Sequence, residues 1–254
     1  MQTPIKNSIQ DGNCVSLLKQ MIPAGSVIDT FLFYSGAIDY NLASHDRFVR
    51  AHTTNYYIDE FWKCMRTNAR KVHNIVTSEV FRFNEEEFPL LQEKWPMQKD
   101  PFIRAALFFL LNRCSETGMI SSGELNMTNF NPVALNYLRA FKEPKNFYLK
   151  HHQNESVAEV IEKYRTSEIV FIPGGNFSYN FFEEGKNKAY ESTTFKHAEI
   201  HNALKQRTNR WVINYKQHPQ LRDMYKDFNI VMIDKYGNKT TIEKNCKEVL
   251  IANY

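Results

Sequence analysis

Short apolar segments rich in β-branched and aromatic residues lie on both sides of a long helical stretch, and this arrangement constrains the fold most. Val27–Phe33 (VIDTFLF) is the clearest such segment, and similar ones follow at 168–172, 210–215 and 228–233. Segments of this kind predict buried strands of a parallel sheet. Residues 58–146 instead carry apolar residues at helical spacing almost throughout. The pattern predicts an α/β sheet interrupted by a helical insertion.

Weaker patterns complete this outline. Strands are also expected at 48–52, 147–150 and 249–254, and the polar stretch 114–131 predicts a loop or hairpin. Asp100 followed by Pro101 is typical of a helix start, with an N-cap and a proline in the first turn. The expected helices cover 15–22, 58–76, a segment starting at 85–87, 100–113, 132–141, 156–164 and 195–206.

Composition excludes several classes of protein. Apolar residues make up 43% and charged residues 24% of the chain, which is typical of a globular protein and not of a disordered one. Only 9 of 254 residues are glycine, which argues against a glycine-rich phosphate loop. The longest apolar run, Ala105–Leu111, is too short to span a membrane. The polar start of the chain has no secretory signal, so we expect a cytoplasmic protein that is not secreted.

Metal sites are not expected. The four cysteines lie at least 50 positions apart, which fits reduced thiols and not a zinc site or a disulfide framework. His197 and His201 share one helix face, but no third ligand is evident. His151 and His152 would point to opposite sides of a strand and cannot bind one ion together.

Several strings of the sequence follow one another in the order found in one enzyme family. Gly12–Leu18 (GNCVSLL) stands where that family has G-N-K-x-x-L-L at a helix start. Ile28–Gly36 (IDTFLFYSG) stands where the family has a strand ending in an acid, an aromatic residue and glycines. Ala51–Thr54 (AHTT) resembles the A-N-D-I strand end, and Glu248–Tyr254 (EVLIANY) matches the closing E-V-L-I-x-N-Y.

Two further strings fall within the helical stretch. Asn112-Arg113 fits a helix end of the form N-R, and Gly123–Asn126 (GELN) fits a G-x-F-N loop. Together these strings resemble the Dam-type adenine-specific DNA methyltransferases of bacteria and phages, over nearly the whole chain. The resemblance implies a Rossmann-like methyltransferase sheet formed by 1–57 and 147–254, with residues 58–146 as an inserted helical domain like the target-recognition domain of that family.

The resemblance also implies S-adenosylmethionine as cofactor and double-stranded DNA as substrate. The cofactor positions would be Asp29, Phe31, Gly36 and Thr53. The family binds the ribose hydroxyls with a carboxylate where this chain has Thr53, and threonine brings no charge. Phe33 and Tyr34 stand where small residues are expected in the cofactor loop. Their rings are predicted to fill the cofactor slot, and the alternative is plain packing in the core.

The catalytic tetrapeptide of the family, D-P-P-Y, has no match here. Its place is taken by Ile172, Pro173, Gly174 and Gly175. In the family, the aspartate accepts from the adenine amino group and the aromatic ring stacks on the flipped base. Ile172 cannot accept a hydrogen bond and Gly175 has no ring. A shifted register that uses Asn176-Phe177 would lack both prolines.

These departures favour a catalytically degenerate homologue that binds DNA or a partner protein and needs no cofactor. One alternative is a divergent but active methyltransferase that uses S-adenosylmethionine. Another is a structural or assembly protein, for instance of a phage, that reuses the fold. No membrane partner is expected.

Contact with DNA is expected from the insertion. Lys63, Arg66 and Arg70 form a basic stripe on its first helix, which would contact phosphates or simply be a solvated helix face. Asn112, Arg113 and Asn126 would contact bases, because arginine and asparagine side chains do so, or they would hold the local loop together.

Overall fold

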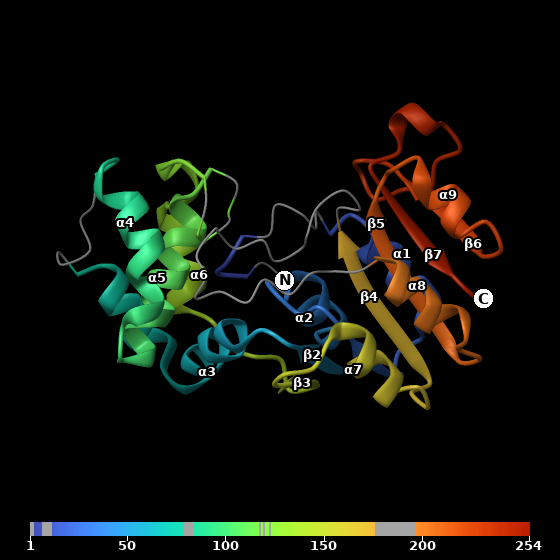
Figure 1. The fold of residues 1–254 in the computed structure, drawn as a ribbon, viewed down its shortest axis with the longest axis horizontal. Helices are drawn as coiled ribbons and strands as arrows, with labels where there is room; N and C mark the ends of the chain where they lie inside the picture. The colour runs from blue at the N-terminus through green and yellow to red at the C-terminus, as the bar shows by residue number, and fades with distance from the viewer. Residues whose placement is uncertain are drawn as a thin grey trace.

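A seven-stranded mixed sheet forms the centre of the molecule, in the order β3-β2-β1-β4-β5-β7-β6 (Figure 1). The structure is a computed structural model that describes residues 3–6, 12–78, 84–116, 118, 120–121, 123–175 and 197–254. The strands are β1 Val27–Thr30, β2 Phe48–Thr53, β3 Phe147–His151, β4 Ile169–Gly175, β5 Arg210–Lys216, β6 Asn229–Ile233 and β7 Glu248–Ala252.

The direction and order of the strands define the fold. Strands β1 to β5 are parallel, and β7 lies antiparallel between β5 and β6. The strand order reverses between β1 and β4, so the carboxyl ends of these two strands form the topological switch point of a doubly wound sheet. This is the Rossmann-like methyltransferase fold that the sequence predicts.

Helices flank the sheet and fill the stretch between β2 and β3. In Figure 1, α3 to α6 gather on the side of the molecule away from β5, β6 and β7. The helices are α1 Val15–Met21, α2 Ala37–Ala43, α3 Tyr56–Val76, α4 Glu87–Lys94, α5 Pro101–Cys114, α6 Pro132–Arg139, α7 Val157–Lys163, α8 His197–Lys205 and α9 Gln220–Met224, with short 3-10 turns η2 Trp95–Met97, η3 Met127–Asn129 and η4 Glu243–Asn245.

Local capping explains where several helices begin. The Asn55 side chain accepts from the backbone N–H groups of Tyr57 and Ile58 and starts α3. Asp100 does the same for α5, where Pro101 occupies the first turn as expected. Ser156 and Glu159 form a reciprocal capping box at the start of α7.

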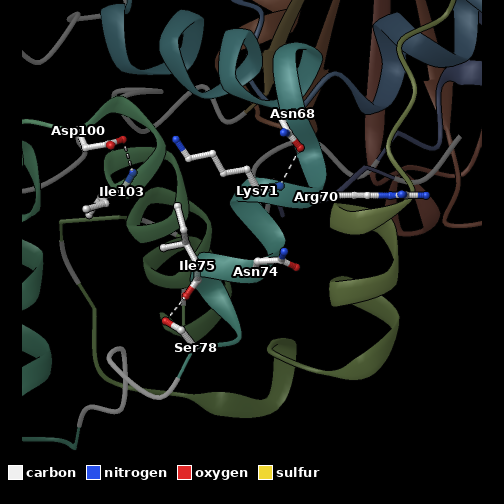
Figure 2. A pocket seen from close by; sticks show the side chains of 8 residues that line it. All are labelled: Asn68, Arg70, Lys71, Asn74, Ile75, Ser78, Asp100 and Ile103. Carbon is white, nitrogen blue, oxygen red and sulfur yellow. Dashed lines mark hydrogen bonds between the residues drawn. The ribbon is translucent and has the colours of Figure 1, made fainter.

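Helix α3 is bent at Asn68, whose φ of −162° and ψ of 81° are not helical. The Asn68 side chain accepts from the Lys71 backbone N–H at 2.9 Å, so it caps the second half of the helix as an N-cap would (Figure 2). The sequence predicts one helix over this range and gives no sign of the bend.

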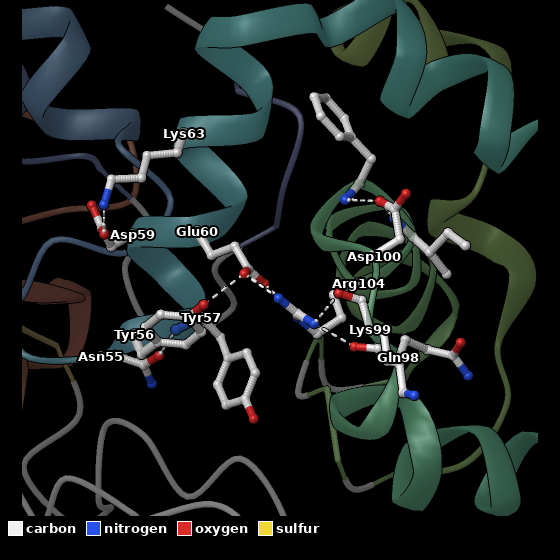
Figure 3. Close-up of polar contacts among 12 residues, drawn as sticks. Asn55, Tyr56, Tyr57, Asp59, Glu60, Lys63, Gln98, Lys99, Asp100 and Arg104 are labelled. Atoms are coloured by element: carbon white, nitrogen blue, oxygen red, sulfur yellow. Dashed lines mark hydrogen bonds and ion pairs between the residues drawn. The ribbon is translucent and has the colours of Figure 1, made fainter.

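Helices α3 and α5 are joined by a largely buried ion pair. Arg104 donates to the Glu60 carboxylate through Nε at 2.7 Å and also through Nη2, and it binds the carbonyls of Gln98 and Lys99 (Figure 3). Tyr56 donates its hydroxyl to the same carboxylate at 2.8 Å. Charged groups at this depth are tolerated because each is paired and hydrogen-bonded.

The helices expected at 15–22, 58–76, 100–113, 132–141 and 156–164 are all present within a few residues of their expected ends. Of the helix expected at 195–206, residues 195 and 196 lie outside the described part. Two short helices, α2 and α9, are not predicted. They have 7 and 5 residues, too few for a recognisable apolar period.

Candidate functional site

The switch point between β1 and β4 is where a sheet of this kind binds its ligands. The segment that follows β1 toward this region carries buried side chains. Phe31, Phe33 and Tyr34 are 1%, 0% and 8% exposed. Leu32 between them is buried and has a φ of 60°, an uncommon backbone conformation for a residue with a branched side chain.

Phe33 belongs to an aromatic cluster that joins the sheet to the helices. Its ring lies 5.3 Å from the ring of Phe147, 5.8 Å from that of Tyr40 and 5.8 Å from that of Trp62, between ring centroids. The Trp62 indole N–H donates to the Tyr34 carbonyl at 2.8 Å. The loop after β1 is therefore held by aromatic packing and by a hydrogen bond from α3.

Gly36 has a structural reason to be glycine. Its φ is 70°, and a Cβ added there would lie 2.4 Å from the Tyr40 ring. The left-handed backbone and the close ring both exclude a side chain. The space next to this glycine is thus occupied by Tyr40 of α2.

Asp29 is fully buried in β1 and is held by two residues of β2. It accepts from the Arg50 guanidinium and from His52 Nε2, the latter at 2.9 Å. Burial raises the pKa of Asp29, but the bonds from His52 and Arg50 outweigh burial, so its pKa lies below the ordinary value. The Asp29 carboxylate is therefore committed to the sheet.

Thr53 ends β2 and is 2% exposed. Its hydroxyl accepts from the Asn55 backbone N–H at 3.2 Å, next to the start of α3. Thr53 therefore takes part in the turn between β2 and α3.

A chain of buried polar groups continues from Asp29 across the carboxyl ends of β2 and β3. His52 Nδ1 lies 3.0 Å from His152 Nε2, and His152 Nδ1 lies 3.5 Å from a carboxylate oxygen of Glu155. Burial lowers the pKa of both histidines. Sequence reasoning missed this network. The one available signal was an aspartate within an apolar strand, because a buried carboxylate needs partners.

The end of β4 holds the four residues that the resemblance aligns with the catalytic tetrapeptide. Ile172 is completely buried, and Pro173, Gly174 and Gly175 are buried as well. A Cβ on Gly174 would lie 2.6 Å from the Tyr215 ring and 2.8 Å from the Asn214 carbonyl oxygen. Gly174 is therefore required by the close approach of β5. The shifted register at Asn176-Phe177 lies outside the described residues.

The basic residues of α3 differ in their surroundings. Lys63 pairs with Asp59 at 2.7 Å (Figure 3), and Arg66 lies 3.8 Å from Glu143. Arg70 and Lys71 border a hollow of about 700 Å³ at the bend of α3. Figure 2 shows Lys71 extending toward Asp100 and Arg70 extending away from it. The three residues of the predicted stripe therefore do not form one uncompensated positive surface.

Arg113 and its neighbour Asn112 bind the beginning of the chain. Arg113 donates to the carbonyls of Pro4 and Thr3 at 2.6 and 3.1 Å. Asn112 is fully buried and bonds both the N–H and the carbonyl of Lys6. These contacts fit the second possibility raised by the sequence, in which the pair holds a loop together.

Asn126 caps the 3-10 turn η3 by accepting from the Thr128 N–H at 2.9 Å. Its own N–H donates to the Cys114 carbonyl at 2.6 Å, across the loop that follows α5. Asn126 therefore has a local role in shaping this loop. Asn112 contacts the same loop by donating to the Gly118 carbonyl at 2.7 Å.

A hollow of about 550 Å³ lies between the starts of α1 and α2 and helix α6. Gly12, Ala37, Asn41 and Tyr137 are among its lining residues, whereas Phe31 and Thr53 are not. The side-chain oxygen of Asn41 is buried and has no hydrogen-bond partner among the described residues. The hollow thus lies beside the segment after β1, and not at the ends of β1 and β2.

Within the described residues, no group of three or more histidine, cysteine, aspartate or glutamate side chains is placed to hold a metal ion. His197 bonds the Tyr215 hydroxyl at 3.1 Å, and His201 packs on the Tyr225 ring. Over the same described ranges, no helix is both long and apolar enough to cross a membrane.

Comparison with solved structures gives a match at low sequence identity. The chain is similar to the crystal structure of a TehB-like SAM-dependent methyltransferase from Corynebacterium glutamicum, with 10% identity, coverage of 95% of this chain and 85% of that chain, and a TM-score of 0.37. No protein-family model and no curated protein sequence matches the chain. The assignment of the fold therefore rests on the strand order of the sheet.

Proposed function

We propose that this protein is a catalytically degenerate relative of the Dam-type methyltransferases, and that it acts by binding and not by methyl transfer. The observation that carries the proposal is the packing of Phe33 among Tyr40, Trp62 and Phe147 at the end of β1. A methyltransferase sheet keeps this position open, because the cofactor must lie directly against backbone. The close packing of aromatic rings around Phe33 supports a filled cofactor position.

The described residues do not fit S-adenosylmethionine at the predicted positions. The family binds the ribose with a carboxylate at the end of β2, whereas Thr53 brings no charge there and its hydroxyl already accepts from the Asn55 N–H. The nearby Asp29 carboxylate is buried beneath Arg50 and His52. The Tyr40 ring occupies the space beside Gly36.

The end of β4 supports the same proposal. An adenine methyltransferase needs an acceptor there for the amino group of the flipped base. Ile172 offers none and is fully buried in the sheet. Loss of a positioned acceptor typically lowers a rate by about 10²- to 10⁴-fold.

Calorimetry with S-adenosylmethionine tests the proposal, together with transfer of a labelled methyl group to duplex DNA. We expect neither binding nor transfer. The variant Ile172→Asp should not restore transfer, because the cofactor loop is also changed, and it should unfold more readily because it buries a carboxylate. Saturable binding of the cofactor, or methylation above that of a protein-free control, would refute the proposal.

Duplex DNA is the partner that we propose for the helical insertion. Arg70 and Lys71 border the hollow at the bend of α3, while Lys63 and Arg66 stand beside acidic partners. Few uncompensated cations imply weak binding that is sensitive to salt, with each phosphate contact adding roughly 0.9 to the log–log salt slope. Charge reversal at Lys63, Arg66 and Arg70 should weaken binding about equally on all sequences.

An electrophoretic mobility assay at about 50 mM salt, a concentration at which phosphate contacts are strong, tests this partner. Arg113→Gln serves as the comparison, since Arg113 binds Thr3 and Pro4 and should not change DNA affinity while the fold is intact. Failure of the wild-type protein to retard duplex DNA would leave a protein partner or an assembly role as the binding function.

One observation favours an active enzyme as the second candidate. The hollow of about 550 Å³ beside α2 has the size of a small-molecule site. The Asn41 oxygen, which has no partner within the described ranges, is buried among its lining residues. Calorimetry of the wild type and of Asn41→Leu tests this candidate. If the wild type binds S-adenosylmethionine and the variant does not, the result would support a displaced cofactor site and an active methyltransferase.

A further inference from the structure

Strands β2 and β3 carry an unusual set of exposed side chains on one face. Phe48 and Tyr148 are 49% and 60% exposed, although large aromatic residues in strands normally pack against a core. The Arg50 side chain is 46% exposed, and Lys150 is exposed as well. We call these four residues the β2–β3 outer face.

The alternation of side chains along each strand puts the four residues on the same side of the sheet. In β2 the exposed positions alternate with buried Val49 and Ala51, and in β3 they alternate with buried Phe147 and Leu149. Phe147 packs on Phe33 on the opposite face. The outer face is therefore the side that turns away from the aromatic cluster.

The register of the two strands interleaves aromatic and basic residues. Arg50 lies beside Tyr148, and His52 lies beside Lys150. Neighbouring strands are about 4.8 Å apart, and residues two positions apart in a strand are about 6.6 Å apart. Phe48 and Tyr148 are thus diagonal neighbours, and a cation stands next to each ring along its strand.

Within the described part of the chain, helix α7 leaves Phe48 and Tyr148 of this face exposed. The Tyr164 residue that follows α7 packs on His52, with 4.2 Å between ring centroids, and accepts from Lys150 Nζ at 3.1 Å. These contacts lie toward the carboxyl ends of β2 and β3. In Figure 1 β3 lies at the edge of the sheet and α7 lies on its β4 side. The amino-terminal parts of both strands, with Phe48 and Tyr148, remain accessible.

The charges of the face favour an anionic partner. Arg50 is fixed by Asp29, but that carboxylate is completely buried, so the guanidinium is the charge that reaches the surface. Lys150 adds a second cation. Glu168, the residue before β4, is exposed, but it lies beyond β1, next to Val27 and away from Tyr148 and Lys150.

We propose that the β2–β3 outer face binds single-stranded nucleic acid, with bases stacked on Phe48 and Tyr148 and phosphates paired with Arg50 and Lys150. Exposed aromatic rings on a sheet beside basic residues are suited to unpaired bases, whose faces are free to stack. A duplex offers no such faces along its length. This surface includes neither the switch point nor the basic residues of α3, so the inference does not rest on the proposed function.

Fluorescence anisotropy of a labelled oligothymidylate of about 12 nucleotides tests the proposal, since sites of this kind span about 4–16 nucleotides. Each of Phe48→Ala and Tyr148→Ala should weaken binding by about tenfold, within the roughly 5- to 150-fold range that stacking losses produce. Tyr148→Phe keeps the ring and should bind as the wild type does. Tyr236→Ala is the matched control, because Tyr236 is an exposed aromatic residue, 75% exposed, in the turn after β6.

The salt dependence gives an independent measurement. Lys150→Gln should lower the log–log salt slope by about 0.7, the value for one phosphate contact with a single strand. Charge reversal at Arg70 and Lys71 should leave oligothymidylate binding unchanged, which separates this surface from duplex binding by α3.

Three results would overturn the proposal. The first is absence of oligothymidylate binding at about 50 mM salt, where phosphate contacts are strong. The second is binding that Phe48→Ala and Tyr148→Ala leave unchanged. The third is light scattering in which the wild type is a dimer and these two variants are monomers. The face would then be an interface between copies of the chain through the β3 edge.

Discussion

His52 and His152 lie side by side at the ends of neighbouring strands, with 3.0 Å between Nδ1 of the first and Nε2 of the second. Three contacts link Asp29, His52, His152 and Glu155, and two neutral imidazoles carry only two N–H groups. We assign the two protons from this network. His52 Nε2 donates to Asp29 at 2.9 Å, and His152 Nε2 donates to His52 Nδ1 at 3.0 Å. The 3.5 Å contact with Glu155 is left without one.

The first prediction is that stability falls as the pH falls below about 6.5. Burial holds the pKa of both histidines in the folded protein below 6.5, the value expected for the unfolded chain. The unfolded chain therefore takes up protons first, and stabilisation present above pH 6.5 is lost as the pH falls toward the folded pKa values. Asp29 and Glu155 oppose this shift, and Arg50 and Lys150 add to it.

Urea denaturation between pH 5 and 8 measures this effect. His152→Gln should reduce the slope of unfolding free energy against pH by up to about 1.4 kcal/mol per pH unit, the value for one proton. His45→Gln is the control, since His45 is an exposed histidine. An unchanged slope in His152→Gln would contradict the prediction.

Asp39 should show the opposite pH dependence. Burial raises its pKa from 3.8 to about 6, although the Thr30 hydroxyl donates to it at 2.5 Å. A carboxyl group with a raised pKa contributes stability fully below pH 3.8 and loses it as the pH rises through 6. Asp39→Asn should therefore be more stable than the wild type at pH 8, by up to about 3 kcal/mol. At pH 4 the gain should disappear, and equal gains at both pH values would count against the raised pKa.

Glu60→Gln should destabilise the protein by about 3 kcal/mol, because it leaves the largely buried Arg104 guanidinium without its carboxylate. Lys63→Gln, one turn further along α3, removes a pair whose lysine is 64% exposed and should cost less than about 1 kcal/mol. Thermal or urea unfolding of the two variants at pH 7 provides the comparison. Similar losses in both would mean that the α3–α5 pair is no stronger than a surface pair.

Gly36→Ala tests the packing of the loop after β1, and Gly25→Ala, just before β1, is its matched control. Both glycines have left-handed backbone, with φ of 70° and 80°, but only at Gly36 does an added Cβ meet a ring. Gly25→Ala should cost about 1 kcal/mol from backbone strain. Gly36→Ala should cost about 1–3 kcal/mol more, because Tyr40 must move. Equal losses in unfolding free energy would show that the space beside Gly36 is open.

The sequence predicts the strands of this fold better than its polar contacts. The apolar residues of Val27–Thr30 and Ile169–Gly175 predict buried strands. The helix caps at Asp100 and Ser156 can be predicted because they depend on residues close together in the sequence. Helix α2 was missed because its stability comes from packing, with Tyr40 and Leu42 fully buried.

The site was harder to foresee, because its contacts join residues that are far apart in the chain. Arg113 was expected to contact bases only because arginine side chains often do so. In the structure it donates to carbonyls 109 and 110 positions earlier in the chain. No local pattern encodes such a pair. The bulky residues after β1 did indicate a packed loop, because Phe33 and Tyr34 stand where the similar family has small residues. Their consequence for the cofactor stays a prediction.

The position of β7 between β5 and β6 has a consequence for the order in which the sheet can be completed. Strand β6 precedes β7 in the chain, but it joins the sheet only through β7. In any state in which β7 is not yet in the sheet, β6 has no partner strand and the β5 edge toward β7 is unpaired. An open edge of this kind is a template for intermolecular pairing. Folding therefore closes these edges only when Glu248–Ala252 is inserted between its two neighbours.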